Sequence, residues 1–212
     1  MNQGILLIEM HYLPCIQYFV YLNSFEKIII DPNDNYIKQT YRNRCRINGA
    51  NKIENLIIPV QNVSSQKSLT NEVKIDYQQK WLNSHIRAIK SAYGKAPFFE
   101  YYADEIFEIF NKKTERLFDL NRSLLTKCLD IIELKINIEY SEDSSNLDRS
   151  GLFDARNEIN PKIMIDNHHL FFPVEYFQVF GNNFVGNLSI IDLIFCEGPQ
   201  AKEILVKSYA RE

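Results

Sequence analysis

The first 32 residues alternate short apolar runs with a longer aromatic segment, and this pattern constrains the fold more than any other feature of the chain. The run Gly4–Glu9 lacks polar residues at helical spacing and predicts a buried strand. Pro14 suits the first turn of a helix over Ile16–Phe25, and Lys27–Asp31 predicts a second buried strand. We therefore expect a βαβ unit, in which ligand-binding loops follow the carboxyl ends of the strands.

The rest of the chain predicts a smaller β part and a helical part. Asn55–Val60 has the composition of a strand, and Lys74–Tyr77 suits its hairpin partner. Helical spacing then covers about residues 78–135, before Ile136–Tyr140 alternates like a strand. We expect residues 1–212 to form a single α/β domain, with a mixed β-sheet opened by the N-terminal βαβ unit and the helical region packed over it.

Two polar stretches and one capping signal complete the predicted organisation. Gln61–Asn71 is expected to be a connecting loop, and Ser141–Gly151 is a polar loop and a candidate lid. Ser189 and Asp192 have the spacing of a capping box, with Asp in place of Glu, so a helix is expected to begin at Ile190.

The composition is that of a globular protein with one substantial core, because 45% of its 212 residues are hydrophobic and 24% are charged. Cys15, Cys45, Cys128 and Cys196 form no CxxC pair, which predicts reduced thiols in a cytoplasmic protein and neither a zinc site nor a disulfide framework. The first apolar run is too short for a signal peptide or a membrane span, so no membrane insertion is expected.

A cationic stretch follows the second predicted strand and places four cations in nine residues, from Lys38 to Arg46. In an extended chain, Lys38, Thr40, Arg42, Arg44 and Arg46 would share one face. One interpretation is a solvated basic edge of a sheet, which discourages edge pairing. The other is a site for a phosphate or carboxylate, because Arg presents a donor fork that matches these anions. A nucleic-acid partner is disfavoured by the pI of about 5.9.

The residues expected to hold such an anion are neighbours in this stretch, together with a second cationic group from the other half of the chain. They are Lys38, Gln39, Tyr41, Arg42, Asn43 and Arg44, with Arg156 and Lys162 as the second group. Two separated groups of cations would let one site hold a charged donor and a charged acceptor.

Two histidines are candidate bases. His85 lies one turn after Trp81 on an apolar helix stripe, where burial would lower its pKa and keep the imidazole neutral. The alternative for His85 is a core histidine satisfied by a backbone carbonyl. His11 follows the first strand, where a ligand loop is expected, although a single histidine there is often incidental. Cys45 is a further candidate nucleophile, because Arg44 and Arg46 would lower a thiol pKa, or else a packed apolar-face cysteine.

Three polar residues at element ends suit hydrogen bonds to sugar hydroxyls. Asp31 and Asn35 follow the second strand, and Asn187 precedes the last capping signal. Each also has an ordinary structural interpretation, since Asp and Asn favour turns. None of the common nucleotide-binding, hydrolase or zinc-protease motifs is present in the sequence, so no particular cofactor and no metal site is predicted.

Several short motifs resemble the WbqC-like protein family of bacterial surface-polysaccharide loci. They are Tyr12-Leu13-Pro14, Tyr41-Arg42-Asn43-Arg44, Ile58-Pro59-Val60, Trp81 to His85, Ala96-Pro97-Phe98-Phe99, Asp154-Ala155-Arg156 and Asn187 to Leu193. The family usually has His-Gln-Pro before Tyr-Leu-Pro, whereas this chain has Ile8-Glu9-Met10 there and His11 just after. Glu9 and His11 are therefore the alternatives for the role of the family histidine.

The resemblance implies a transferase that places glycine or another acyl group on an amino sugar during synthesis of O-antigen-like polysaccharide. The expected substrate is a phosphate-bearing, nucleotide-linked sugar, held by the cationic stretch. The alternative function is a non-catalytic sugar-nucleotide or glycan-binding module that assists a glycosyltransferase assembly. A nucleotidyl-transfer enzyme is a third interpretation, weakened by the displaced histidine. The sequence does not predict an oligomeric state.

Overall fold

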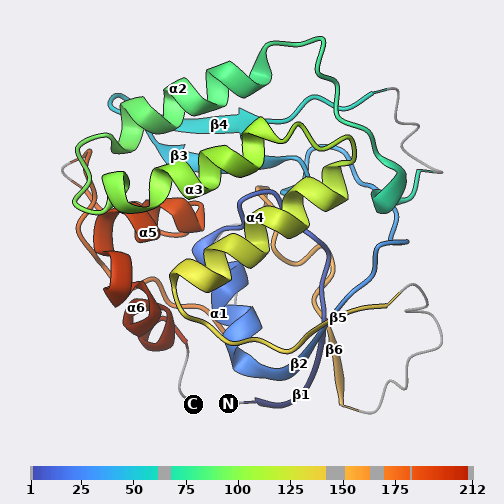
Figure 1. Ribbon diagram of the computed structural model, residues 1–212. Helices are drawn as coiled ribbons and strands as arrows, with labels where there is room; N and C mark the ends of the chain where they lie inside the picture. The colour runs from blue at the N-terminus through green and yellow to red at the C-terminus, as the bar shows by residue number, and fades with distance from the viewer. Residues whose placement is uncertain (1, 62–67, 142–150, 163–169, 182, 210–212) are drawn as a thin grey trace.

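The computed structural model describes residues 2–61, 68–141, 151–162, 170–181 and 183–209 (Figure 1). The predicted lid at residues 141–151 therefore falls almost wholly outside the described residues, as does the central part of the predicted loop at residues 61–71.

Four parallel strands form the main sheet, in the order β5-β2-β1-β6. Their bounds are Asn2–Leu7 for β1, Phe25–Ile30 for β2, Ile138–Tyr140 for β5 and Leu152–Asp154 for β6. Helix α1, Ile16–Ser24, connects β1 to β2, so the predicted βαβ unit and the α/β class are confirmed. Because the strands are parallel, all four carboxyl ends lie at one edge of the sheet.

A second, two-stranded ribbon pairs β3, Arg44–Asn48, with β4, Ile53–Ile57, in antiparallel register. An antiparallel bridge between Val60 and Ile75 continues this pairing and agrees with the predicted hairpin. The parallel and antiparallel pairings thus lie in two sheets, because β3 joins β4 and not the edge of the main sheet.

The cationic stretch is extended only from Arg44 onward, and residues 38–43 form turns. Gln39 adopts a left-handed conformation with a φ of 63°, which interrupts the alternation of faces. The prediction that Arg42 shares a face with Arg44 and Arg46 is therefore wrong. The turn directs Arg42 inward, where it is completely buried.

Five α-helices follow the β ribbon in the described chain. They are α2 Trp81–Tyr93, α3 Phe99–Asn111, α4 Leu117–Ile131, α5 Ile190–Glu197 and α6 Ala201–Lys207. Helix α2 lies beside the β3–β4 ribbon and packs against α3, and α4 packs against α3 and runs obliquely toward the main sheet (Figure 1). No helix in the described part of the chain is long and apolar enough to cross a lipid bilayer.

Helix α5 begins where the sequence predicts, although the capping box does not form. The hydroxyl of Ser189 donates to the carbonyl of Leu13 at 2.8 Å, and the side chain of Asp192 accepts hydrogen bonds from Tyr176 and Gln178. Tertiary partners have thus replaced the local capping bonds, and they join α5 to segments far away in the sequence.

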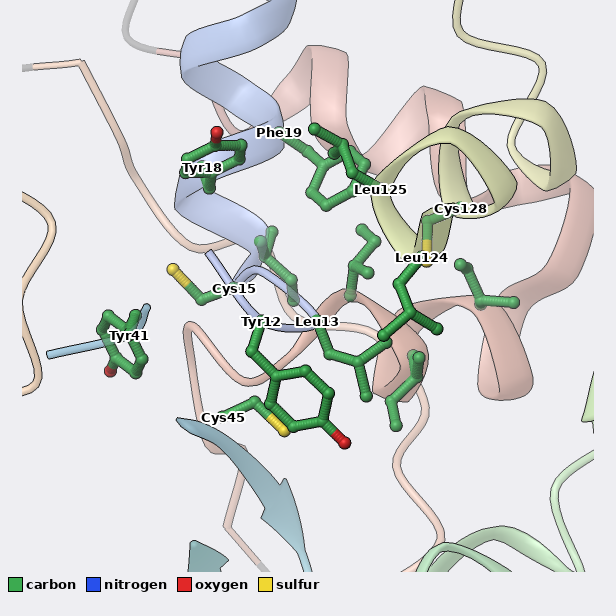
Figure 2. Packing of buried hydrophobic residues seen from close by; sticks show 14 of the residues in the cluster. Tyr12, Leu13, Cys15, Tyr18, Phe19, Tyr41, Cys45, Leu124, Leu125 and Cys128 are labelled. Atoms are coloured by element: carbon green, nitrogen blue, oxygen red, sulfur yellow. The ribbon is translucent and has the colours of Figure 1, made fainter. Parts of the chain in front are cut away.

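The core lies where α1, α4 and α5 meet the turn that follows β1. Leu13, Phe19, Leu124 and Leu125 are fully buried there, and Figure 2 shows them gathered between α1 and α4. Burying each such side chain contributes about 1.5–3 kcal/mol to folding. Tyr41 lies at the margin of this cluster, on the side of Cys15 (Figure 2). The core therefore holds the turn after β1 in place beside the charged residues described next.

Candidate functional site

Polar side chains from three loops, two of them carboxylates, meet at Arg42 beside the carboxyl edge of the main sheet. Its guanidinium donates to Asp34 Oδ2 at 2.7 Å and to Asn157 Oδ1 at 3.1 Å, and lies 3.5 Å from Glu9 Oε1. Glu9 follows β1, Asp34 follows β2 and Asn157 follows β6. The site is thus assembled by the parallel order of the strands, at the place where α/β sheets bind ligands.

Glu9 is the acidic centre of this network. Its carboxylate accepts the backbone N–H of Asn157 at 3.1 and 3.0 Å, and it lies 3.1 Å from Nε2 of His11. Burial alone would raise the pKa of Glu9. The hydrogen bond to His11 and the charge of Arg42 outweigh burial and lower that pKa. Glu9 is therefore a carboxylate at neutral pH.

His11 is completely buried between two tyrosine rings. Its ring centroid lies 4.8 Å from that of Tyr18 and 5.7 Å from that of Tyr41. Since a carboxylate only accepts hydrogen bonds, Glu9 requires the proton of neutral His11 to sit on Nε2. Nδ1 then carries a lone pair, and it has no hydrogen-bond partner among the described residues. A histidine that a carboxylate orients through one ring nitrogen, and whose other nitrogen has a free lone pair, has the arrangement of a general base.

A second guanidinium lies at the rim of the network. Arg156 makes two hydrogen bonds to the carboxylate of Asp154, at 2.9 and 2.7 Å, and lies 3.7 Å from Asp34. The hydrogen bonds to Asp154 raise the pKa of Arg156, which therefore stays charged. Arg156 is only 29% exposed. Asp31, three residues before Asp34 in the sequence, is buried, and its carboxylate accepts the backbone N–H of Asn33 at 2.7 Å.

The remaining residues of the cationic stretch differ in their burial. Lys38 and Gln39 are exposed, whereas Asn43 is buried and donates to the carbonyl of Ile58 at 2.8 Å. Arg44 and Arg46 are half-buried on β3. Of the other predicted residues, Asn35 and Lys162 are exposed.

His85 belongs to a different part of the molecule. Its Nδ1 accepts the hydroxyl of Tyr12 at 3.0 Å, its ring meets Trp81 edge-on, and the backbone of Ile57 provides a further hydrogen bond. Burial lowers the pKa of His85 to about 4, as the sequence predicts for an apolar stripe. In the described structure none of its contacts is with Glu9 or Arg42. Its surroundings are those of the alternative interpretation, a core histidine satisfied by the backbone.

Two further predictions concern Asn187 and Cys45. Asn187 exchanges two hydrogen bonds with Gln17, each 2.9 Å, and so ties the chain before α5 to α1. Cys45 is buried on the inner face of β3, and burial raises the pKa of its thiol. The expectation of a lowered thiol pKa is wrong, because strand alternation places Cys45 on the face opposite Arg44 and Arg46.

Sequence reasoning missed Asp34 and Asn157. Asp34 ends a turn that begins at Asp31, the residue that the sequence suggested as a contact for sugar hydroxyls. Asn157 follows β6, a strand of three residues that is too short to predict from periodicity. Asp34 lies four positions after the end of β2 and Asn157 three positions after the end of β6, so the only signal of either one is a polar residue soon after a strand.

The fold and this network define an α/β protein with a buried ionic site at the carboxyl edge of a parallel sheet. The chain belongs to the WbqC-like protein family, whose model matches residues 10–168. It is 27% identical over 138 residues to the uncharacterized protein Rv1507c of Mycobacterium tuberculosis, a match that covers 65% of this chain and 59% of that protein. The chain thus spans less than two thirds of that relative. No solved structure matches the chain.

Proposed function

We propose that the protein is an acyl or aminoacyl transferase that acylates the amino group of a phosphate-bearing, nucleotide-linked amino sugar for surface-polysaccharide synthesis. The observation that carries this proposal is the pairing of Glu9 with His11, which leaves Nδ1 of a carboxylate-oriented imidazole without a partner among the described residues. Membership of the WbqC-like family supports the substrate class.

The reaction requires a neutral amine and a place for its proton. In the proposed step, the sugar nitrogen attacks the acyl carbon, a C–N bond forms, and the bond from that carbon to the leaving group breaks. His11 Nδ1 accepts the proton of the amine and returns it to the leaving group. The carboxylate of Glu9, 3.1 Å from Nε2, stabilises the imidazolium while it exists.

The surrounding residues divide into positioning and binding roles in this proposal. Arg42 is a positioning residue, because its guanidinium contacts Glu9, Asp34 and Asn157. Asp31, with Asn35 at a more exposed position, is a proposed contact for sugar hydroxyls, and Arg156 and Lys162 are the proposed second cationic group, for the charged acyl donor. Lys38 and Gln39 extend this surface.

A non-catalytic sugar-nucleotide-binding module is the second candidate function, and burial favours it. His11 and Arg42 are both 0% exposed, so a substrate reaches Nδ1 only if neighbouring groups move. A module that binds without turnover would use only the rim residues.

The test is a mass-spectrometric assay of amino-sugar nucleotides with acyl-CoA thioesters, and with glycine plus ATP. We expect wild type to form an N-acyl product and His11→Gln to lose about 100-fold or more in rate, since a general base contributes that much. Arg87→Gln, on the exposed face of α2, is the surface control and keeps wild-type activity. If His11→Gln forms product at the wild-type rate, His11 is not the general base. Saturable sugar-nucleotide binding without product from any donor favours the binding module.

A further inference from the structure

Arg44 and Arg46 lie on one face of β3 without an acidic partner. Two residues of a strand span about 6.6 Å, so the two side chains leave the same face of the ribbon at neighbouring positions. Across the ribbon, Arg44 faces Ile57 and Arg46 faces Asn55, neither of which carries a negative charge. Neither arginine forms an ion pair with any described residue, and Nε of Arg44 is buried without an acceptor.

Among the described cations that form no ion pair, Arg44 and Arg46 are half-buried, whereas the others are exposed. Seven of the described lysines and arginines pair with carboxylates: Lys27, Arg42, Lys74, Lys112, Lys127, Arg156 and Lys207. Two like charges side by side repel each other, and partial burial strengthens the repulsion because it lowers the effective dielectric constant. An anion between Arg44 and Arg46 would remove this cost and satisfy the buried Nε.

Tyr41 joins the two arginines to the candidate base. The side chain of Arg46 lies within hydrogen-bonding reach of Tyr41, whose ring is 5.7 Å from that of His11. Burial raises the pKa of Tyr41 to about 12, and likewise that of Tyr36, which lies within electrostatic range of Arg44. Both phenols are therefore protonated at neutral pH, and each hydroxyl is able to donate to an anion.

We propose that Arg44 and Arg46 form the site that holds the diphosphate of the sugar substrate, with the ring of Tyr41 between this anion and His11. Each guanidinium takes one phosphate through its donor fork. The assignment of the diphosphate to a sugar nucleotide rests on the proposed function, whereas binding of a diphosphate at these residues does not. Arg42, the most buried cation of the stretch, is not part of this site because its charge is already paired.

Calorimetric titration with pyrophosphate at constant ionic strength tests the site. We expect saturable binding to wild type, a loss of tenfold or more in affinity for Arg44→Gln and for Arg46→Gln, and no change for Arg87→Gln. The double variant Arg44→Lys with Arg46→Lys keeps both charges but lacks the guanidinium donor forks. Its affinity for pyrophosphate is therefore expected to lie between that of wild type and that of the glutamine variants. In nitrogen-proton NMR spectra, the Nε–H signal of Arg44 should shift on addition of pyrophosphate to wild type.

The outcomes separate this inference from the proposed function. Three results would overturn the diphosphate site, whatever the transferase assay gives. They are the absence of saturable pyrophosphate binding to wild type, wild-type affinity in both Arg44→Gln and Arg46→Gln, and a loss of affinity in Arg87→Gln as large as in those two variants. Wild-type pyrophosphate affinity in His11→Gln is expected, because His11 belongs to the reaction and not to the anion site. If pyrophosphate binds at Arg44 and Arg46 but no acyl product forms, the site stands and the transferase function fails.

Discussion

Two buried histidines of this protein have different partners. His11 is buried next to the carboxylate of Glu9, whereas His85 is buried among aromatic rings and neutral donors. Burial penalises the charged imidazole of His85 and lowers its pKa, and no carboxylate contacts that ring among the described residues. At the scale of the residue, the partner of a histidine therefore decides whether it is able to accept a proton during a reaction.

His85 should make the free energy of unfolding depend on pH. Its pKa is about 4 when folded, below the usual 6.5, so the unfolded chain binds a proton at higher pH than the folded chain does. Stability is therefore complete above about pH 6.5 and falls by about 3 kcal/mol as the pH drops to about 4. Urea denaturation of wild type and His85→Gln across this range measures the effect. An identical pH dependence for the two proteins would contradict it.

At the scale of the element, strand alternation and helix ends decide which side chains are available. On β3, Cys45 and Ile47 face the core, while Arg44 and Arg46 face outward. At the end of α5, Gly198 adopts a φ of 52° and packs closely against Phe98, which begins the turn into α3. The junction between these two helices therefore depends on a residue without a side chain.

Gly198→Ala should destabilise the fold more than Gly151→Ala does. A Cβ at Gly198 would lie 2.5–2.8 Å from three ring atoms of Phe98, whereas at Gly151 nothing lies within 4 Å. Both glycines have positive φ, so Gly151→Ala controls for backbone strain alone. We expect a loss of about 1 kcal/mol for Gly151→Ala and about 2–4 kcal/mol for Gly198→Ala. Equal thermal midpoints for the two variants would show that Phe98 moves without cost.

At the scale of the whole molecule, Arg42 connects segments that are far apart in the sequence. Its guanidinium contacts the loops after β1, β2 and β6, and its carbonyl accepts the side-chain amide of Asn121 on α4 at 2.8 Å. A buried arginine that neutralises two carboxylates is costly to remove, because the carboxylates would be left without compensation.

Arg42→Ala should therefore reduce the free energy of unfolding by about 3–5 kcal/mol. Hydrogen exchange of the β6 amides should also accelerate, since Asn157 would lose a partner just beyond that strand. Arg87→Ala, which removes an exposed arginine from α2, should leave the denaturation midpoint unchanged. A change in Arg42→Ala as small as that of the control would show that Glu9 and Asp34 do not depend on Arg42.

The amino-acid sequence by itself determined the βαβ opening, the start of α5 and the presence of the cationic stretch, because hydrophobic periodicity and turn residues act over a few neighbouring positions. Only the tertiary structure decided that Arg42 pairs inward while Arg44 and Arg46 form no ion pair with the described residues, and that Glu9 orients His11. Those relations depend on strand order and on one left-handed residue, Gln39, which bring side chains together from distant segments. A local pattern carries no information about such contacts, whereas the parallel sheet places its carboxyl ends side by side.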